Sequence, residues 1–324
     1  MPSKYPTFDV SRLSLKPLAQ RENIVHLDDI LPPDAPASKF AHQALPELSR
    51  QILASRGRAS VILMMGAHVI KEGLSRYVIE LIRRGWVDGI ALNGAGVIHD
   101  FELALQGATS ESVAKYIRQG QFGLWRETGR INDVIHQAAG EGLGYGEAMG
   151  REIAGGQYPH RDLSVLAAAY ATNVPVTVHV GIGYDIIHEH PNFDAAAAGA
   201  CSYRDFLIFA QLVERLQGGA LLCFGSAIMG PEVYLKALSM SRNVAARAGR
   251  SITDFTTAVF DIVGLPDDLS HTPPMSEPAY YYRPFKTILV RTVADGGRSF
   301  YVRGEHRQTL PALYAELVKQ AADM

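Results

Sequence analysis

The chain has 324 residues, 47% of them hydrophobic, and a formal net charge of −2 at pH 7. A chain of this length and apolar content can bury a large core, which argues against intrinsic disorder. Charges of both signs nearly cancel and no long block of Lys and Arg occurs, so the sequence lacks the electrostatic footprint of a nucleic-acid or membrane-surface binder. The expected partner is therefore a small molecule.

The cysteine content and the hydropathy pattern predict a cytoplasmic location. Only Cys201 and Cys223 occur, without C-x-x-C spacing, which is typical of a reducing compartment and of a chain without structural zinc. No apolar run reaches about 18 residues, the length that indicates a membrane span, and the first residues lack the pattern of a signal peptide. We therefore expect a cytoplasmic protein with no membrane and no nucleic-acid partner.

The order of elements predicts an arm followed by one α/β domain. Residues 1–35 carry Pro, Asp and scattered apolar residues and are predicted to form an N-terminal arm. Residues 36–324, which open with a helical pattern over 38–56, are predicted to form a single Rossmann-like domain for cofactor binding and catalysis.

Short apolar runs alternate with helical patterns through this domain. Strands are expected near 60–66, 88–93, 175–180, 219–224, 256–261 and 298–302. Helices are expected near 70–84, 97–118, 162–172, 202–216, 230–249 and 308–321, with a further one from Phe285. Because each pair of parallel strands needs a crossover connection, this alternation predicts a doubly wound, mostly parallel sheet flanked by helices.

Two stretches break the alternation. Residues 140–156 are rich in glycine, and we expect them to interrupt the chain, although their spacing is not that of a phosphate-binding loop. Residues 262–284 are rich in Pro, Ser, His and Tyr. A connection this long is usually functional or disordered.

Three apolar runs end in small residues followed by a polar or titratable group. They cover 61–68, 89–100 and 176–188. This pattern is typical of a buried parallel strand that leads into a helix. Since open α/β sheets bind ligands at the carboxyl ends of their strands, we expect the active site there.

Several of these segments can be compared with a known family. The segments Gly66-Ala-His-Val-Ile-Lys-Glu-Gly73 and 87–100 are followed by Gly181-Ile-Gly-Tyr-Asp185 and by the glycine-rich strand end over 219–228. The strand at 257–261 is followed by a Pro-rich loop and Pro278-x7-Lys286. In this order, over about 60 to 320, the chain resembles the deoxyhypusine synthase family.

The resemblance implies a Rossmann-like fold, NAD as cofactor and a homotetramer. It also implies that Lys286 matches the lysine that carries the aminobutyl group as an imine, which requires a neutral amine. Contacts to NAD are implied for residues at the strand ends, although tight turns and helix caps are alternative explanations for them. These residues are Gly66, His68, Asn93, Gly94, Gly96, Gly183, Asp185, Gly225, Ser226 and Asp261.

The chain departs from the family where the family recognises a polyamine. It has Ile98-His99 in place of an acidic pair and Gly230-Pro231 in place of a catalytic His-His pair, and the loop before Lys286 lacks the family's acidic residues and tryptophan. Carboxylates and aromatic faces are what hold an extended dication. We therefore expect an NAD-dependent enzyme of the deoxyhypusine or homospermidine synthase type that acts on another small amine, by aminoalkyl transfer or by oxidation through a Lys286 imine.

His99 and Asp100 are the predicted proton-handling residues. They follow a strand by one turn, and an unperturbed His has the pKa nearest neutrality, which suits a general base. The alternative is a histidine that only satisfies hydrogen bonds at a helix start.

Two other functions remain open from the sequence. His179, Asp185, His188 and His190 could hold a catalytic zinc or iron ion in a hydrolase, although His188 and His190 share a face only on a strand. The other alternative is a nucleotide-binding sensor that keeps the scaffold without its chemistry.

Overall fold

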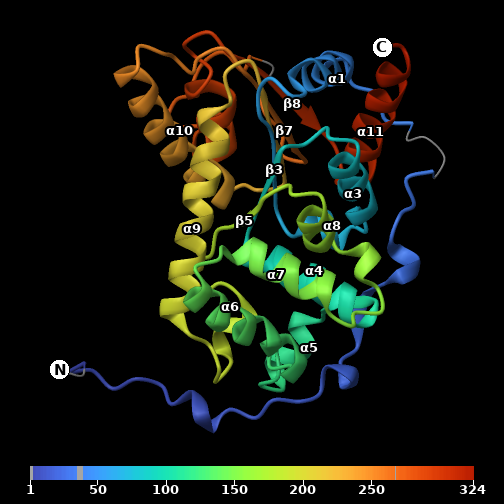
Figure 1. Ribbon diagram of the computed structural model, residues 1–324, viewed down its shortest axis with the longest axis vertical. Coiled ribbons are helices and arrows are strands. Elements are labelled where there is room, and N and C mark those ends of the chain that lie inside the picture. Colours follow the sequence, from blue (N-terminus) through green and yellow to red (C-terminus); the bar gives the residue numbers. More distant parts are fainter. Residues whose placement is uncertain (1–2, 35–38, 267) are drawn as a thin grey trace.

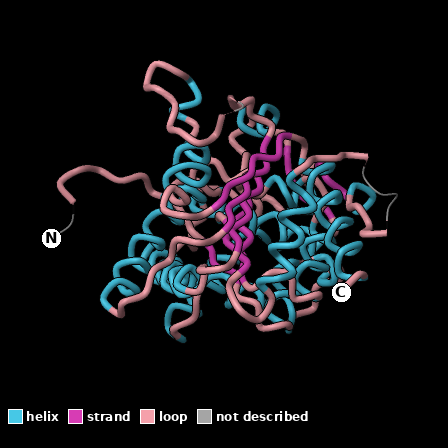
Figure 2. Tube along the Cα trace, turned by 90° about the horizontal axis from the view of Figure 1, so that it is seen from above, coloured by secondary structure: helices cyan, strands magenta, loops and turns pink. Residues whose placement is uncertain are grey.

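The computed structural model describes residues 3–34, 39–266 and 268–324. Its centre is a six-stranded sheet in which every neighbouring pair of strands is parallel, in the order β5-β3-β2-β6-β7-β8. Figure 1 shows the arrangement, and Figure 2 shows the sheet between two layers of helices. The strands are β2 (Val61–Met65), β3 (Gly89–Leu92), β5 (Val176–Val178), β6 (Ala220–Phe224), β7 (Thr256–Asp261) and β8 (Arg298–Arg303). The predicted Rossmann-like fold is thus confirmed.

The chain changes direction across the sheet at one point. From β2 it proceeds outward through β3 and β5, and it then returns to build β6, β7 and β8 on the other side of β2. This is the strand order of dinucleotide-binding doubly wound sheets, in which connections diverge from the two central strands and leave a crevice at their carboxyl ends. That crevice lies here between β2 and β6.

The side chains of β2 alternate between two cores, one on each face of the sheet. Val61, Leu63 and Met65 belong to the larger core, and Ile62 and Met64 to the smaller. The larger core contains residues of α1 (Ala44–Ser55), α3 (Ser75–Arg83), α4 (Gly94–Gln106), α6 (Arg130–Glu141), α7 (Tyr145–Gly155), α8 (Val165–Ala171) and α11 (His306–Ala322). The smaller core contains residues of α9 (Ala195–Glu214), α10 (Met229–Arg247) and the π-helix η8 (Phe285–Arg291).

The sequence predicts helices through 97–118, and the structure has two helices there with a strand between them that the sequence did not indicate. Helix α4 ends at Gln106, and Gly107 caps it with a left-handed φ of 67° that favours glycine. The strand β4 (Ala108–Glu111) follows and pairs antiparallel with β1 (Asn23–His26), and α5 (Val113–Arg118) comes next. The partner of β4 lies far away in the sequence, so local periodicity could not indicate this strand.

The glycine-rich stretch 140–156 contains α7, where only an interruption was expected. Two of its glycines allow close helix packing. A Cβ added at Gly146 would lie 1.8 Å from the carbonyl oxygen of Val176, and one at Gly150 would lie 2.7 Å from that of Leu166. Gly146 and Gly150 thus bring backbones together, while Gly142, with a left-handed φ of 74°, caps the end of α6.

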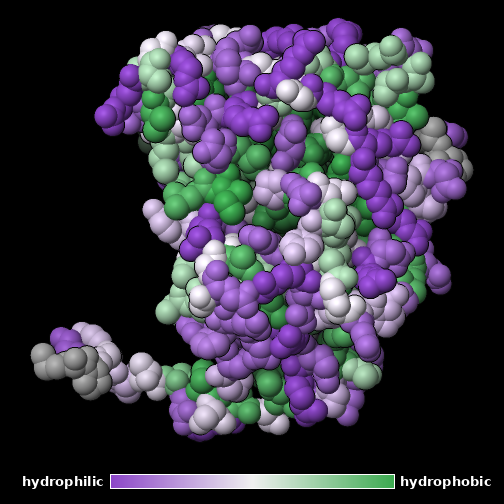
Figure 3. All heavy atoms as spheres, in the orientation of Figure 1, coloured by the Kyte–Doolittle hydropathy of each residue, from purple (hydrophilic) through white to green (hydrophobic). Residues whose placement is uncertain are grey.

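The N-terminal segment is extended at first and then packs against the domain. Its first described residues run away from the body of the molecule (Figures 1 and 3). Further along, Leu18 and Arg21 are buried, and β1 joins β4. The predicted boundary at residue 35 falls outside the described residues, so the division into arm and domain stays a prediction.

Among the described residues, no helix has the length and apolar content needed to cross a membrane. The remaining short helices are α2 (His68–Lys71), η1 (Val10–Arg12), η2 (Leu18–Gln20), η3 (Leu27–Asp29), η4 (Arg126–Gly129), η5 (Arg161–Leu163), η6 (Ile186–Glu189) and η7 (Pro278–Tyr281).

Candidate functional site

A cleft of about 610 Å³ opens at the point where the sheet changes direction. We call it the switch-point cleft. Its walls come from the ends of four strands: Gly66 after β2, Asn93 and Gly94 after β3, residues 179–185 after β5, and residues 225–233 after β6. The volume lies within the usual range for small-molecule sites. The cleft thus lies at the edge of the sheet where the sequence predicts the site.

Glycines bring the two central strands together at the floor of this cleft. A Cβ added at Gly66 would lie 2.4 Å from the Gly225 carbonyl oxygen. Gly225 itself has a φ of 61°, and its added Cβ would lie 2.5 Å from Nε2 of His306. Ser226 is buried and its hydroxyl accepts a hydrogen bond from the Gly230 N–H at 3.0 Å. These residues shape the turn from β6 into α10.

The N-terminus of α4 faces the cleft and is capped by two side chains. Asn93 accepts a hydrogen bond from the Gly96 N–H at 3.0 Å, and the Asp185 carboxylate accepts one from the Ala95 N–H. A Cβ added at Gly94 would lie 2.1 Å from Oδ2 of Asp185. Burial raises the pKa of Asp185 to about 6. Asp185 is also the N-cap residue of the helix that follows it, η6 (Ile186–Glu189), so it contributes to the starts of both helices.

The four residues of the metal alternative do not converge. His188 Nδ1 accepts hydrogen bonds from the N–H groups of Gly183 and Asp185 at 3.0 and 3.2 Å. His190 Nε2 bonds to the Gly123 carbonyl oxygen at 2.9 Å, and His179 Nε2 lies 3.0 Å from the Thr177 hydroxyl. Across the described ranges, no three His, Cys, Asp or Glu side chains are grouped so that they could hold a metal ion. The hydrolase alternative is therefore not supported.

A smaller cavity of about 230 Å³ opens beside the switch-point cleft and shares Ala95, Tyr184 and Asp185 with it. We call it the side chamber. His99, Lys71 and Glu111 are among its polar lining residues. Burial lowers the pKa of His99 to about 4, so its imidazole is neutral at pH 7. The structure thus places the predicted proton-handling histidine next to the cleft.

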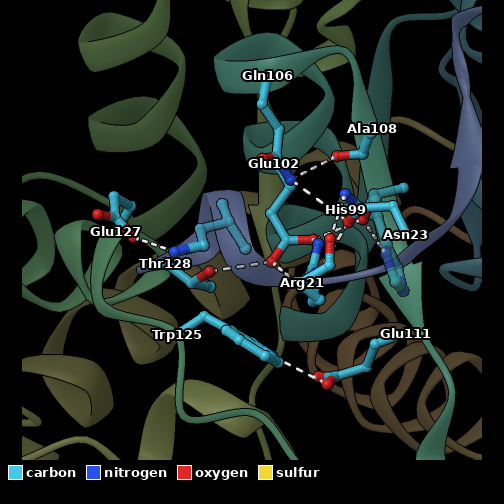
Figure 4. A network of polar contacts seen from close by, with 12 residues as sticks. Arg21, Asn23, His99, Glu102, Gln106, Ala108, Glu111, Trp125, Glu127 and Thr128 are labelled. Atoms are coloured by element: carbon cyan, nitrogen blue, oxygen red, sulfur yellow. Dashed lines mark hydrogen bonds and ion pairs between the residues drawn. The ribbon is translucent and has the colours of Figure 1, made fainter. Parts of the chain in front are cut away.

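A buried ion pair supports the wall of this chamber (Figure 4). Arg21 donates two hydrogen bonds to Glu102, at 2.8 and 2.6 Å, and both side chains are buried. The hydroxyls of Thr109 and Thr128 donate to the same carboxylate at 2.6 and 2.9 Å. Nδ1 of His99 lies 2.8 Å from the Thr109 hydroxyl.

Asp100 points away from the cavities described above. Its carboxylate accepts hydrogen bonds from the Ser164 hydroxyl and from the N–H groups of Val165 and Leu166, at 2.5, 2.7 and 3.3 Å. It therefore caps α8, and burial raises its pKa to about 6. The geometry gives Asp100 a structural role and separates it from its neighbour His99.

A third cavity of about 720 Å³, the outer cleft, lies on the other side of the Gly225–Ala227 turn. It is lined by three of the predicted cofactor residues, His68, Gly225 and Asp261. Asp261 accepts hydrogen bonds from the Tyr282 hydroxyl at 2.6 Å and from the Ile262 N–H at 2.7 Å. The predicted NAD contacts are thus divided between two clefts that share the Gly225–Ala227 turn, while Gly183 lies in an exposed turn with a φ of 92°.

Lys286 is buried, with 6% of its surface exposed, at the second position of η8. Its ammonium lies 3.7 Å from the centre of the Tyr280 ring, and such a cation–π contact partly replaces lost hydration. The nearby Arg283 pairs with Glu232 of α10. Lys286 does not line any of the three cavities described above.

Sequence reasoning missed the residues around His99. Arg21 comes from the predicted N-terminal arm, while Glu102, Thr109 and Glu111 come from the stretch 97–118 that is predicted to be helical. Charged residues in a predicted surface helix give no signal of burial. Only knowledge of the pairing between β1 and β4 would have brought them together.

Fold and site together define an α/β protein of the doubly wound, Rossmann-like class with a ligand cleft at its switch point. No protein-family model matches the chain, and no curated protein matches its sequence. Solved structures match its fold at low identity. A candidate LOR/SDH protein of Methanococcus maripaludis S2 is 12% identical with a TM-score of 0.51, over 88% of this chain and 70% of that one.

Two further solved structures match the chain over different shares of their own length. Unliganded AgrE is 14% identical with a TM-score of 0.51, over 88% of this chain and 34% of its own, so this chain spans about a third of AgrE. A deoxyhypusine synthase candidate of Entamoeba histolytica is 10% identical with a TM-score of 0.43, over 80% and 74%. Identities of this size show a shared fold alone. The deoxyhypusine synthase resemblance stays a prediction from the motifs.

Proposed function

We propose that this protein is an NAD-dependent enzyme that acts on a small amine, by oxidation or aminoalkyl transfer. The observation that carries the proposal is the cleft at the switch point of the sheet. In doubly wound sheets of this strand order, the dinucleotide lies across the crevice at the carboxyl ends of the two central strands. The residues present here fit such a ligand.

The switch-point and outer clefts lie on either side of the Gly225–Ala227 turn. A dinucleotide that crosses this turn would place one half in each cleft. The turn leads into α10, a 19-residue helix whose N-terminus favours the charge of a diphosphate. Asp185 in one cleft and Asp261 in the other would accept hydrogen bonds from ribose hydroxyls. When bound, NAD would supply the hydride acceptor.

The finer part of the proposal concerns Lys286. An amine that forms an imine must be neutral, and Lys286 is the amine to which the motifs give this role; its side chain is buried, with 6% of its surface exposed. The lysine lies on a π-helix, an element that often occurs at functional sites. We also propose a cytoplasmic location, which the cysteine content favours, and a homotetramer, which the motifs imply.

The cofactor is tested by thermal unfolding with and without NAD. A ligand at about 100 times its Kd stabilises the native state by about 2.7 kcal/mol, which for a domain of this size raises Tm by several degrees. Ala227→Glu adds a negative charge at the turn between the clefts, and Ala227→Gln is the control of equal size. The shift should vanish in the first and persist, at least in part, in the second. No shift in the wild type would overturn the proposal.

The amine chemistry is tested by borohydride trapping. AgrE has been crystallised with ornithine and NAD⁺ and with L-arginine, and this chain spans about a third of AgrE, so these compounds serve only as assay candidates beside 1,4-diaminobutane. Reduction with NAD present should add mass to the peptide that contains Lys286, and Lys286→Arg should abolish the addition. NAD binding without NADH formation from any amine would favour the nucleotide-binding alternative.

A further inference from the structure

We propose that the side chamber binds the primary ammonium group of the substrate, with His99 Nε2, Glu111 and Asp185 as its hydrogen-bond acceptors. The inference rests on the proposed function and names the place of the amine within it. The chamber shares Ala95, Tyr184 and Asp185 with the switch-point cleft, so a ligand in one adjoins a ligand in the other. At about 230 Å³ it is smaller than a typical whole-ligand site and suits one end of a molecule.

The hydrogen-bond network fixes the tautomer of His99. An ionised carboxylate only accepts hydrogen bonds, and the Glu102 carboxylate accepts two from Arg21. The Thr109 hydroxyl therefore donates its one proton to Glu102, at 2.6 Å. Its oxygen is then left to accept from Nδ1–H of His99, at 2.8 Å.

With the proton on Nδ1, a neutral His99 carries its lone pair on Nε2. Within the described part of the chain, Nε2 makes no hydrogen bond, and His99 lines the chamber. The arrangement is that of a histidine oriented by a third group, as in catalytic triads. It presents an acceptor to any N–H group that enters the chamber.

The charges around the chamber favour a cation. Arg21 and Glu102 neutralise one another. Glu111 is buried, with 8% exposed, and accepts hydrogen bonds from the Gly123 N–H at 3.1 Å and the Trp125 indole at 2.9 Å. Among the described residues Glu111 has no ion-pair partner.

Asp185 adds a second carboxylate at the mouth shared with the cleft, and Lys71 is the one remaining cation among the lining residues. The balance of the ionised groups is therefore negative. The other walls include Ile98 and Phe122, apolar surfaces that would receive an aliphatic stem. An ammonium on a short alkyl chain satisfies both features, whereas a carboxylate would meet repulsion.

The test is calorimetric titration of the full chain, with and without saturating NAD, using n-butylamine, L-ornithine and butyrate. Both amines should bind and butyrate should not. Glu111→Gln should weaken amine binding at least tenfold. Glu141→Gln, on an exposed residue of α6, should leave it unchanged.

A second pair of variants covers the case in which Glu111→Gln does not fold. Val113 lines the chamber and is 54% exposed, so its substitution should not disturb the core. Val113→Lys should weaken amine binding severalfold and Val113→Glu should strengthen it, because each places a charge at the rim.

The outcomes separate the two proposals. Amine binding with this pattern of variants supports the chamber assignment, and it does so even if NAD fails to bind, which would overturn only the proposed function. Two results would overturn the chamber assignment and leave the NAD proposal intact. The first is NAD binding without amine binding. The second is amine binding whose affinity is unchanged by both the Glu111 and the Val113 substitutions.

Discussion

Gly94→Ala tests whether Asp185 and the start of α4 are packed as described. The new Cβ would lie 2.1 Å from Oδ2 of Asp185, so the carboxylate must retreat by about 1.3 Å to reach ordinary contact. That movement breaks its hydrogen bond from the Ala95 N–H. Overpacking and the lost charged hydrogen bond together should cost about 2 to 4 kcal/mol of unfolding free energy.

A double-mutant cycle isolates the cause. Asp185→Ala removes the clashing atoms, so Gly94→Ala should cost much less in its presence, and the coupling free energy should be about 1 to 3 kcal/mol. Urea unfolding of the wild type, both single variants and the double variant measures it. Costs that add to within about 0.5 kcal/mol would refute the packing argument, and the reason for Gly94 would then have to be sought in a bound ligand.

Gly73→Ala should cost more than about 3 kcal/mol, because an added Cβ would lie 2.1 Å from a backbone carbonyl oxygen at a φ of 73°. Gly57→Ala, at a φ of 70° in open space, should cost about 1 kcal/mol, and equal costs in urea unfolding would contradict this. Thr109→Val should populate the Nε2–H tautomer of His99, seen in ¹⁵N NMR of labelled histidine; unchanged nitrogen shifts would mean that the hydroxyl does not orient the ring. Asp100 has its pKa raised from 3.8 to about 6 by burial, so the native state holds the proton more tightly and loses stability as pH rises through about 6. The unfolding free energy of the wild type minus that of Asp100→Asn should therefore fall by about 2 kcal/mol between pH 4 and pH 7, and a flat or rising difference would show that the hydrogen bonds to Asp100 outweigh its burial.

The sheet was predictable because its signal is local. Strands buried on both faces appear as continuous apolar runs, as in 61–65 and 220–224, and the helices between them fix a parallel arrangement. The same runs end at the edge where ligands bind, so Asn93, Gly94 and Asp185 could be placed at the cleft from the sequence.

The side chamber was not predictable, because its parts meet only through distant pairing. Asn23 aligns with Glu111 where β1 pairs with β4. Neither strand has an apolar pattern from which a strand could be predicted. The prediction for His99 and Asp100 illustrates the limit. Adjacent residues on a helix point in different directions, so His99 lines the chamber whereas Asp100 caps α8. The dipeptide alone does not indicate which of the two side chains faces a cavity.

The Arg21–Glu102 pair makes the side chamber conditional on the N-terminal segment. The six-stranded sheet contains no residue from before position 61, yet the charge that balances Glu102 comes from residue 21. Until that segment docks, Glu102 has no counterion beside Thr109 and His99, and a buried, unpaired carboxylate is strongly unfavourable. The scaffold and the chamber can thus be separated in assembly: a segment that lies outside the six-stranded sheet completes the wall of the side chamber.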